Sequence, residues 1–183
     1  MIYRHKDLKN QGLSNYQIKK KVEKKELFMI QKGVYSDTHE SENLDIILSK
    51  HSDCVMTLDS ALYYYGLIKK EPKYFYLATK QKARKINNDL VKQTFMTDSL
   101  LFLGNNKIKY NGHVILSFDL ERLLIEVVRN KPKMDYDIYQ ESIRSFYKLK
   151  KILNIKKLND YVSKFNDKKI IERINNDLLK KES

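Results

Sequence analysis

The spacing of apolar and polar positions separates a small N-terminal segment from the rest of the chain. A short helix is predicted within Asp7–Gly12, because glycine is a typical residue at a helix C-terminus. Ser14 then offers an N-cap for a second helix over Asn15–Lys25. In that helix Ile18 and Val22 form one narrow apolar stripe, and lysines occupy much of the remainder. The pattern is typical of a helix at the protein surface.

After this helix the spacing of the apolar residues is no longer helical. Residues 26–36 contain two apolar pieces about a turn at Gly33, which predicts a β-hairpin. Residues 37–43 are polar and carry no apolar anchor, so they are the best linker candidate. We therefore expect a recognition module over residues 1–37 and a second domain over residues 43–183.

The second domain mixes strand-like and helix-like segments and then becomes helical. Asn111-Gly112 lies between two β-rich runs and is a strong hairpin signal. Strands are expected at 54–57, 74–78, 93–96, 100–103 and 107–118, and helices at 44–51, 58–66, 120–128, 139–147, 158–165 and 171–178. Ser117 or Asp119 is expected to cap the helix that starts at 120. This order of elements predicts an α+β fold with a helical tail.

The charge is high and unevenly distributed. The formal net charge is +13, with 30 lysines and 6 arginines, a bias that the codon usage of an AT-rich genome also produces. Residues 1–36 carry nine basic and three acidic groups, and residues 131–183 carry fourteen basic and eight acidic groups. The middle part, residues 37–130, is nearly neutral, with thirteen basic and twelve acidic groups. Both ends are therefore candidate contacts for a polyanion, although a solvated helical face explains the C-terminal end equally well.

Other features of the composition exclude several classes of protein. Cys54 is the only cysteine, so no intramolecular disulfide can form. No apolar stretch approaches the roughly 20 residues that cross a bilayer. Hydrophobic residues make up 42% of the chain, which indicates a packed core. We expect a cytoplasmic protein with no membrane partner.

The N-terminal segment contains the parts of a winged helix-turn-helix in their usual order. A short helix, a turn, an amphipathic helix and a basic hairpin would place the second helix in the major groove of DNA. The expected contacts are Asn15, Tyr16, Lys19 and Lys20 with base edges, Ser14, Lys21, Lys24 and Lys32 with phosphates, and Gln31 with the minor groove. The alternative is an ordinary helix and hairpin that pack on the larger domain.

Three blocks of the sequence resemble AbiEi-type antitoxins of bacterial type IV toxin–antitoxin (abortive infection) systems. The first block is Asp7-Leu-Lys-Asn-Gln-Gly-Leu-Ser14, followed by a helix and by Lys32-Gly-Val-Tyr35. The others are Ser60-Ala-Leu-Tyr-Tyr-Tyr-Gly-Leu67 and Asp119-Leu-Glu-Arg-Leu-Leu124. Together they span roughly residues 3–150.

The resemblance implies a winged-helix N-terminal domain and an α/β C-terminal antitoxin domain. It also implies a phage-defence protein that represses its own operon by binding inverted repeats in promoter DNA. Such an antitoxin counters a nucleotidyltransferase toxin without forming a stable complex with it. In the family a further helix precedes the segment equivalent to Asp7–Gly12. A winged domain without that helix would leave apolar surface exposed. We therefore expect the C-terminal domain or a second copy to cover Ile18, Val22 and Leu27.

A metal-dependent nuclease is the alternative from another class. Asp59 with Glu71-Pro-Lys73 matches the acid and Glu-x-Lys pattern of such enzymes, but Pro72 fits poorly inside a strand. His51 and Cys54 offer only two ligands for a metal. No glycine-rich phosphate loop or nucleophile motif is present. We expect no enzyme activity, no cofactor and no metal.

Aromatic and basic residues of the second domain leave an RNA-binding alternative open. Tyrosines at helical spacing could stack on bases, although core packing is favoured for them. These tyrosines are Tyr63, Tyr64, Tyr65, Tyr139, Tyr147 and Tyr161. The basic tail over Lys148–Lys181 is the second feature that fits RNA.

Overall fold

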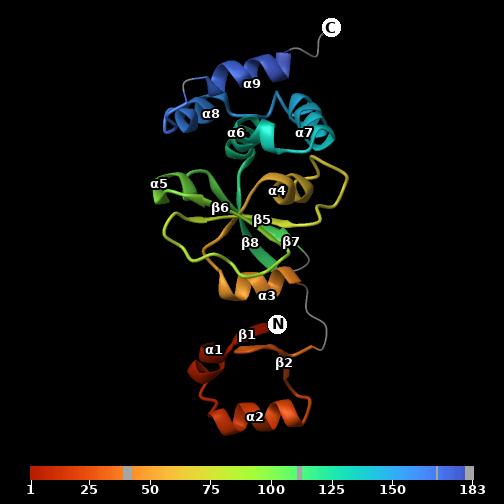
Figure 1. The fold of residues 1–183 in the computed structure, drawn as a ribbon, viewed down its shortest axis with the longest axis vertical. Helices are drawn as coiled ribbons and strands as arrows, with labels where there is room; N and C mark the ends of the chain where they lie inside the picture. Colours follow the sequence, from red (N-terminus) through yellow and green to blue (C-terminus); the bar gives the residue numbers. More distant parts are fainter. Residues whose placement is uncertain (39–42, 111–112, 168, 180–183) are drawn as a thin grey trace. The chain divides into compact units, whose positions relative to one another are not determined.

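The computed structural model describes residues 1–38, 43–110, 113–167 and 169–179 (Figure 1). Its contacts divide the chain into two compact units, Met1–Asp53 and Cys54–Ser183. Most of the linker expected at residues 37–43, and the Asn111-Gly112 turn, lie outside the described residues.

The N-terminal unit combines helices with a small antiparallel sheet. Strand β3 lies in the middle of this sheet, with β1 on one side and β2 on the other. The elements are β1 (Ile2–Arg4), α1 (His5–Asn10), α2 (Asn15–Glu23), β2 (Phe28–Gln31), β3 (Val34–Ser36) and α3 (Asn43–Lys50). The two expected helices and the hairpin are confirmed, and β1 is an element that the sequence pattern did not predict.

A local core holds the N-terminal unit together. Leu8, Ile18, Leu27 and Tyr35 are buried and pack as one cluster. Tyr3 of β1 packs against this cluster, as do Leu13 and Val22. The expectation that the second domain or another copy must cover this surface is therefore corrected: α1, the hairpin and the unexpected strand β1 supply the apolar partners.

Helix α3 belongs with the N-terminal unit. It contacts strand β1, and the contact-based division of the chain falls after Asp53 rather than within residues 37–43. Leu44 and Ile47 are buried residues of this amphipathic helix. A polar stretch identifies the connection, but the contacts of the following helix decide to which unit that helix belongs.

The C-terminal unit is built on a mixed sheet in the order β6-β5-β4-β8-β7. Parallel pairing joins β5 to β6 and β4 to β8, and the other pairs are antiparallel. The strands are β4 (Val55–Met56), β5 (Phe75–Lys80), β6 (Val91–Met96), β7 (Asn105–Tyr110) and β8 (His113–Phe118). The expected hairpin strands are confirmed, since Tyr110 and His113 are partners in the register.

Helices complete this unit and bury its apolar core. Helix α4 packs on β5, whereas α7, α8 and α9 gather around α6 (Figure 1). The helices are α4 (Leu58–Tyr64), α5 (Asp98–Leu101), α6 (Leu120–Asn130), α7 (Tyr136–Lys148), α8 (Ile155–Val162) and α9 (Ile170–Leu179), with a 3₁₀ turn η1 (Lys131–Lys133). The mixture of helices and strands confirms the α+β class.

The strand expected at residues 100–103 is wrong. Leu100 and the fully buried Leu101 end the short helix α5, which begins at Asp98, and residues 102–103 follow it outside any strand. The backbone carbonyl of Thr97 accepts hydrogen bonds from Leu100 and Leu101, as at a helix start. A run of four apolar residues has no period that distinguishes a strand from a buried helical turn.

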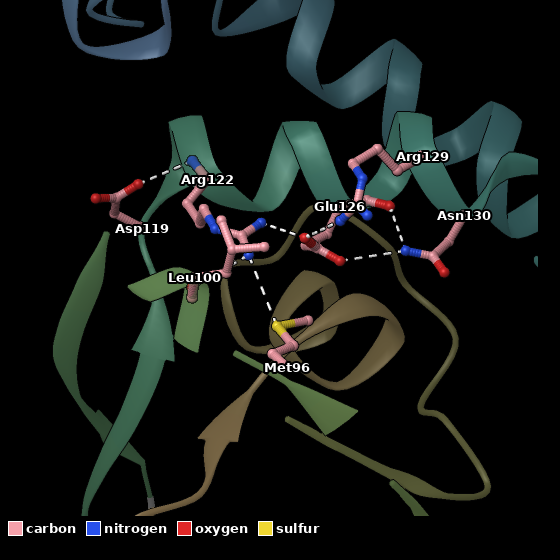
Figure 2. A network of polar contacts seen from close by, with 7 residues as sticks. All are labelled: Met96, Leu100, Asp119, Arg122, Glu126, Arg129 and Asn130. Atoms are coloured by element: carbon pink, nitrogen blue, oxygen red, sulfur yellow. Dashed lines mark hydrogen bonds and ion pairs between the residues drawn. The ribbon is translucent and has the colours of Figure 1, made fainter. Parts of the chain in front are cut away.

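A completely buried arginine connects several elements of the C-terminal unit (Figure 2). Arg122 of α6 pairs with Glu126 one turn later, and it donates to the Leu100 carbonyl at 3.3 Å. Its guanidinium contacts two rings, 4.3 Å from the centroid of Phe118 and 4.7 Å from that of Phe165. The side chain thus contacts the sheet, helix α5 and the segment after α8.

The Glu126 carboxylate receives further donors. Arg129 donates to it at 3.0 Å and the Asn130 amide at 3.2 Å (Figure 2). Burial lowers the pKa of Arg122, and the charge of Glu126 opposes that shift. Buried ions are tolerated when they are paired and hydrogen-bonded in this way.

Close packing at Gly104 keeps the backbone of Arg122 near the strand β7. Gly104 has a φ of +73°, and a Cβ there would lie 2.7 Å from the Arg122 Cβ and 2.9 Å from Tyr161 Cε2. Glycine is therefore required both by the backbone conformation and by the close approach of α6.

We expect Arg122→Met to lower the free energy of unfolding by about 3 kcal/mol, because it leaves the Glu126 carboxylate buried with fewer cationic partners. Arg144→Met, at an exposed position of α7, is the control and should change it by less than about 0.5 kcal/mol. Urea unfolding of the full chain measures both. Arg122→Met combined with Glu126→Leu should recover part of the loss, and a double variant no more stable than Arg122→Met alone would contradict the charge argument.

Candidate nucleic-acid interface

The face of α2 opposite the small core is exposed. Ile18 is 3% exposed, whereas Tyr16 is 70% exposed although it is a large aromatic residue. At 100° per residue, Tyr16, Lys20 and Lys24 form a row on the side of α2 directed away from Ile18. Burial of the Ile18 side therefore orients the basic row toward solvent.

The row has internal contacts that favour an ordered arrangement. The Lys20 ammonium lies 5.7 Å from the centroid of the Tyr16 ring. Exposed cation–π contacts of this kind contribute about 0.5–1 kcal/mol. An aromatic face and two cations thus lie along one exposed line of the helix.

The start of α2 is fixed by a reciprocal cap. The backbone N–H of Gln17 donates to the Ser14 hydroxyl at 3.2 Å, and the backbone N–H of Ser14 donates to the Gln17 side-chain oxygen at 2.8 Å. This arrangement satisfies two backbone donors that the helix leaves free at its first turn. The expected capping role of Ser14 is confirmed, and Asn15 follows it as an exposed residue at the helix start.

Two lysines on the flanks of α2 have acidic neighbours. The Lys21 ammonium is 3.1 Å from the Glu26 carboxylate, and the Lys19 ammonium is 3.9 Å from that of Glu23. All four side chains are partly or largely exposed, so these pairs contribute little free energy. A phosphate could replace either carboxylate, but Lys21 is more engaged than Lys20 or Lys24.

The hairpin extends the basic surface by one residue at its turn. Gly33 adopts a φ of +78°, which allows the tight connection between β2 and β3. Lys32 is exposed beside it, and Gln31 is half-buried at the end of β2. The nine expected contact residues therefore all lie in one unit, on α2, at its caps Ser14 and Lys24, or on the hairpin.

The residues of the nuclease alternative come together, although without the geometry of that enzyme class. Asp59, Glu71 and Lys73 line the same pocket of about 190 Å³. Glu71 and Lys73 precede β5 and are not part of a strand. No group of three or more His, Cys, Asp or Glu among the described residues is placed to hold a metal, and this includes His51 and Cys54.

The tyrosines of the C-terminal unit mostly serve packing, as favoured by their spacing. Tyr139 is buried, and Tyr63 packs against the core. The Tyr65 hydroxyl donates to the Phe118 carbonyl at 2.9 Å, and the Tyr161 hydroxyl donates to Asp119 at 2.9 Å. Tyr64 and Tyr147 are half-buried and also have partners. These six tyrosines therefore all have contacts within the chain.

Part of the basic charge near the C-terminus is neutralised within the unit. Lys157 lies 3.1 Å from Asp119 and 3.2 Å from Glu121, and these carboxylates raise its pKa against the effect of burial. Arg173 pairs with Asp167 at 2.8 Å. The high net charge of residues 131–183 therefore overstates the charge available to a polyanion.

The sequence analysis did not identify the ion pair between Arg4 and Asp7 at the start of α1. The Arg4 guanidinium and its backbone N–H both donate to the Asp7 carboxylate, at 2.9 and 3.0 Å, and these bonds lower the pKa of Asp7. The pair connects β1 to the first turn of α1. Only the spacing of an arginine three residues before an aspartate could have indicated it.

Comparison with known proteins does not assign the chain to a family. No protein-family model matches it, and no curated protein matches it. Across the described ranges, none of the helices has the length and apolar character needed to cross a bilayer.

We expect Ser14→Ala to destabilise the first turn of α2 by about 1 kcal/mol, because it removes the side-chain acceptor of the cap. Ser14→Asp should retain the cap, since aspartate is an equally good N-cap residue. Hydrogen exchange of the Gln17 backbone N–H measures the effect: it should accelerate in Ser14→Ala and stay near wild type in Ser14→Asp. Equal acceleration in both variants would show that the cap does not stabilise this turn.

Proposed function

We propose that the N-terminal unit is a winged-helix module that binds duplex promoter DNA with α2 in the major groove. The observation that carries the proposal is the exposed row of Tyr16, Lys20 and Lys24 on the face of α2 opposite Ile18. Support also comes from the cluster of Leu8, Ile18, Leu27 and Tyr35, which packs the β2–β3 hairpin and its turn residue Lys32 with the two helices. A helix, a turn, a second helix and a hairpin are the parts that DNA-binding proteins of this class use.

The proposed contacts divide by chemistry. Base edges are assigned to Asn15, Tyr16, Lys19 and Lys20 near the start of α2. Backbone phosphates are assigned to Ser14, Lys21, Lys24 and Lys32, with Lys21 exchanging its Glu26 partner for a phosphate, and Gln31 is assigned to the minor groove. Phosphate contacts set affinity and register, whereas base contacts set the sequence preference. Counterion release should make the affinity strongly salt-dependent.

We further propose that the whole chain is a cytoplasmic autorepressor and type IV antitoxin that counters a nucleotidyltransferase toxin without a stable complex. This part rests on the three blocks that resemble AbiEi-type antitoxins. Their residues have structural roles here: Ser60 accepts from the Tyr76 N–H at 2.8 Å, and Asp119 caps α6 by accepting from the Arg122 N–H at 2.9 Å. The blocks therefore support a common architecture more directly than a common active site. The proposal assigns no catalytic step and no cofactor to the chain.

We expect Lys19→Ala with Lys20→Ala to weaken binding of the native promoter more than tenfold, because two cations leave the recognition face. The control is Lys107→Ala with Lys109→Ala, which removes the same charge from exposed positions of β7 and should change affinity less than twofold. Gel-shift titration at constant salt measures both. Unchanged binding in the α2 variant, or equal losses in both variants, would refute the assignment of α2.

Co-expression with the product of the neighbouring gene tests the antitoxin role. If that product arrests growth, we expect the full chain to relieve the arrest. The α2 double variant should also relieve it when expressed from a foreign promoter, because the antitoxin function is assigned to the C-terminal unit. Arrest that the wild-type chain fails to relieve would refute the antitoxin proposal while leaving the DNA-binding proposal intact.

A further inference from the structure

A hollow of about 470 Å³ lies in the C-terminal unit against the edge strand β6. Five consecutive residues of that strand, Val91–Phe95, line it. Asp59 of α4 and Lys133 of η1 line it from other elements of the unit. Its volume falls within the range of about 300–1,000 Å³ that is typical of small-molecule sites.

Three lysines of the hollow have no acidic partner. Lys85, Lys92 and Lys133 all line it and are exposed, and within the described ranges none of them forms an ion pair. Lys131, two residues before Lys133, provides a contrast because it pairs with Asp177 at 2.9 Å. Lys131 therefore has a carboxylate partner, whereas Lys85, Lys92 and Lys133 have none among the described residues. The Lys92 ammonium lies 4.4 Å from the centroid of the Tyr74 ring, a contact that does not neutralise its charge.

An acidic side chain lies in the same hollow and is also left without a cation. Asp59 is half-buried, and among the ion pairs of the described residues none includes it. Burial raises the pKa of Asp59, and hydrogen bonding to the Tyr76 hydroxyl opposes that shift. Burial and the charge of Asp59 raise the pKa of Tyr76 to about 12. Tyr76, the hydrogen-bond partner of Asp59, is also the partner of Lys92 in the β5–β6 register.

The backbone beside Asp59 is strained. Leu58 lines the hollow and has a φ of +44°, a left-handed conformation that is rare for leucine. Such conformations are energetically unfavourable and concentrate at ligand sites. Leu58 is the first residue of α4 and directly precedes Asp59.

We propose that this hollow binds a purine nucleotide, with its phosphate at Lys85, Lys92 and Lys133 and the N–H donors of its base at the Asp59 carboxylate. The inference goes beyond the proposed promoter binding and does not depend on it. Inorganic phosphate would gain from the lysines but would be repelled by Asp59. A ligand that uses both groups must carry its negative charge at one end and hydrogen-bond donors at the other. Guanine presents two adjacent N–H donors, which suit the two oxygens of a carboxylate.

Isothermal titration of the full chain with GMP, AMP, guanosine and inorganic phosphate tests the proposal. We expect GMP to bind at least tenfold more tightly than phosphate or guanosine, and at least fivefold more tightly than AMP. Lys92→Met with Lys133→Met should weaken GMP binding at least tenfold. Asp59→Asn should reduce the preference for GMP over AMP at least fivefold. Lys107→Met with Lys109→Met is the charge-matched control and should bind GMP as the wild type does.

The other outcomes overturn the proposal. An absence of GMP binding at millimolar concentration would exclude a nucleotide site. Equal affinity for phosphate and GMP would reduce the hollow to an anion site, and unchanged binding in the Lys92 and Lys133 variant would place the ligand elsewhere. Urea unfolding of that variant checks its folding, because Lys92 and Lys133 belong to the C-terminal unit and promoter DNA is assigned to the N-terminal unit. Intact promoter binding with lost GMP binding separates the two proposals.

Discussion

Burial of the Arg122 guanidinium is the constraint on which the C-terminal unit depends. An ion in an apolar interior must be paired, hydrogen-bonded and packed at the same time. Here the partners come from elements far apart in the sequence: Phe118 from β8, the Leu100 carbonyl from α5, and Phe165 from the segment after α8. The position of the C-terminal helices is therefore coupled to that of the sheet through one side chain.

The N-terminal unit follows a different principle, because it has only a few buried side chains. Its helices are short, and isolated helices of this length are marginal in water. Local devices compensate: the Ser14–Gln17 cap, the Arg4–Asp7 contact and the β1–β3 pairing. Because the apolar stripe of α2 is narrow, most of its surface remains in solvent. The same narrowness that limits stability leaves a whole helix face available for a ligand.

The spacing of apolar residues predicted most helices and strands, whereas the elements that were missed have no regular apolar spacing. Strand β1 has three residues and pairs with β3 far along the chain, so no local sequence pattern predicts it. Residues 100–103 are apolar without a period, and Leu100 and the buried Leu101 belong to a short helix instead of a strand. The basic face of α2 could be predicted from one helix, but the hollow around Asp59 unites Lys85, Lys92 and Lys133 only through folding. Arg122 is the hardest case, since a charged residue in an amphipathic helix normally indicates solvent.

The two basic ends of the chain carry equal net charge but differ in what that charge can do. Lys157 is held by Asp119 and Glu121, and Lys131 by Asp177, so part of the C-terminal excess stabilises the unit's own fold. On α2, Lys20 and Lys24 have no carboxylate within ion-pair distance among the described residues. The net charge does not distinguish lysines that are paired with a carboxylate from lysines that are not. A polyanion competes only for cations that the fold has not already paired, so the unpaired fraction of the charge is the quantity that indicates binding.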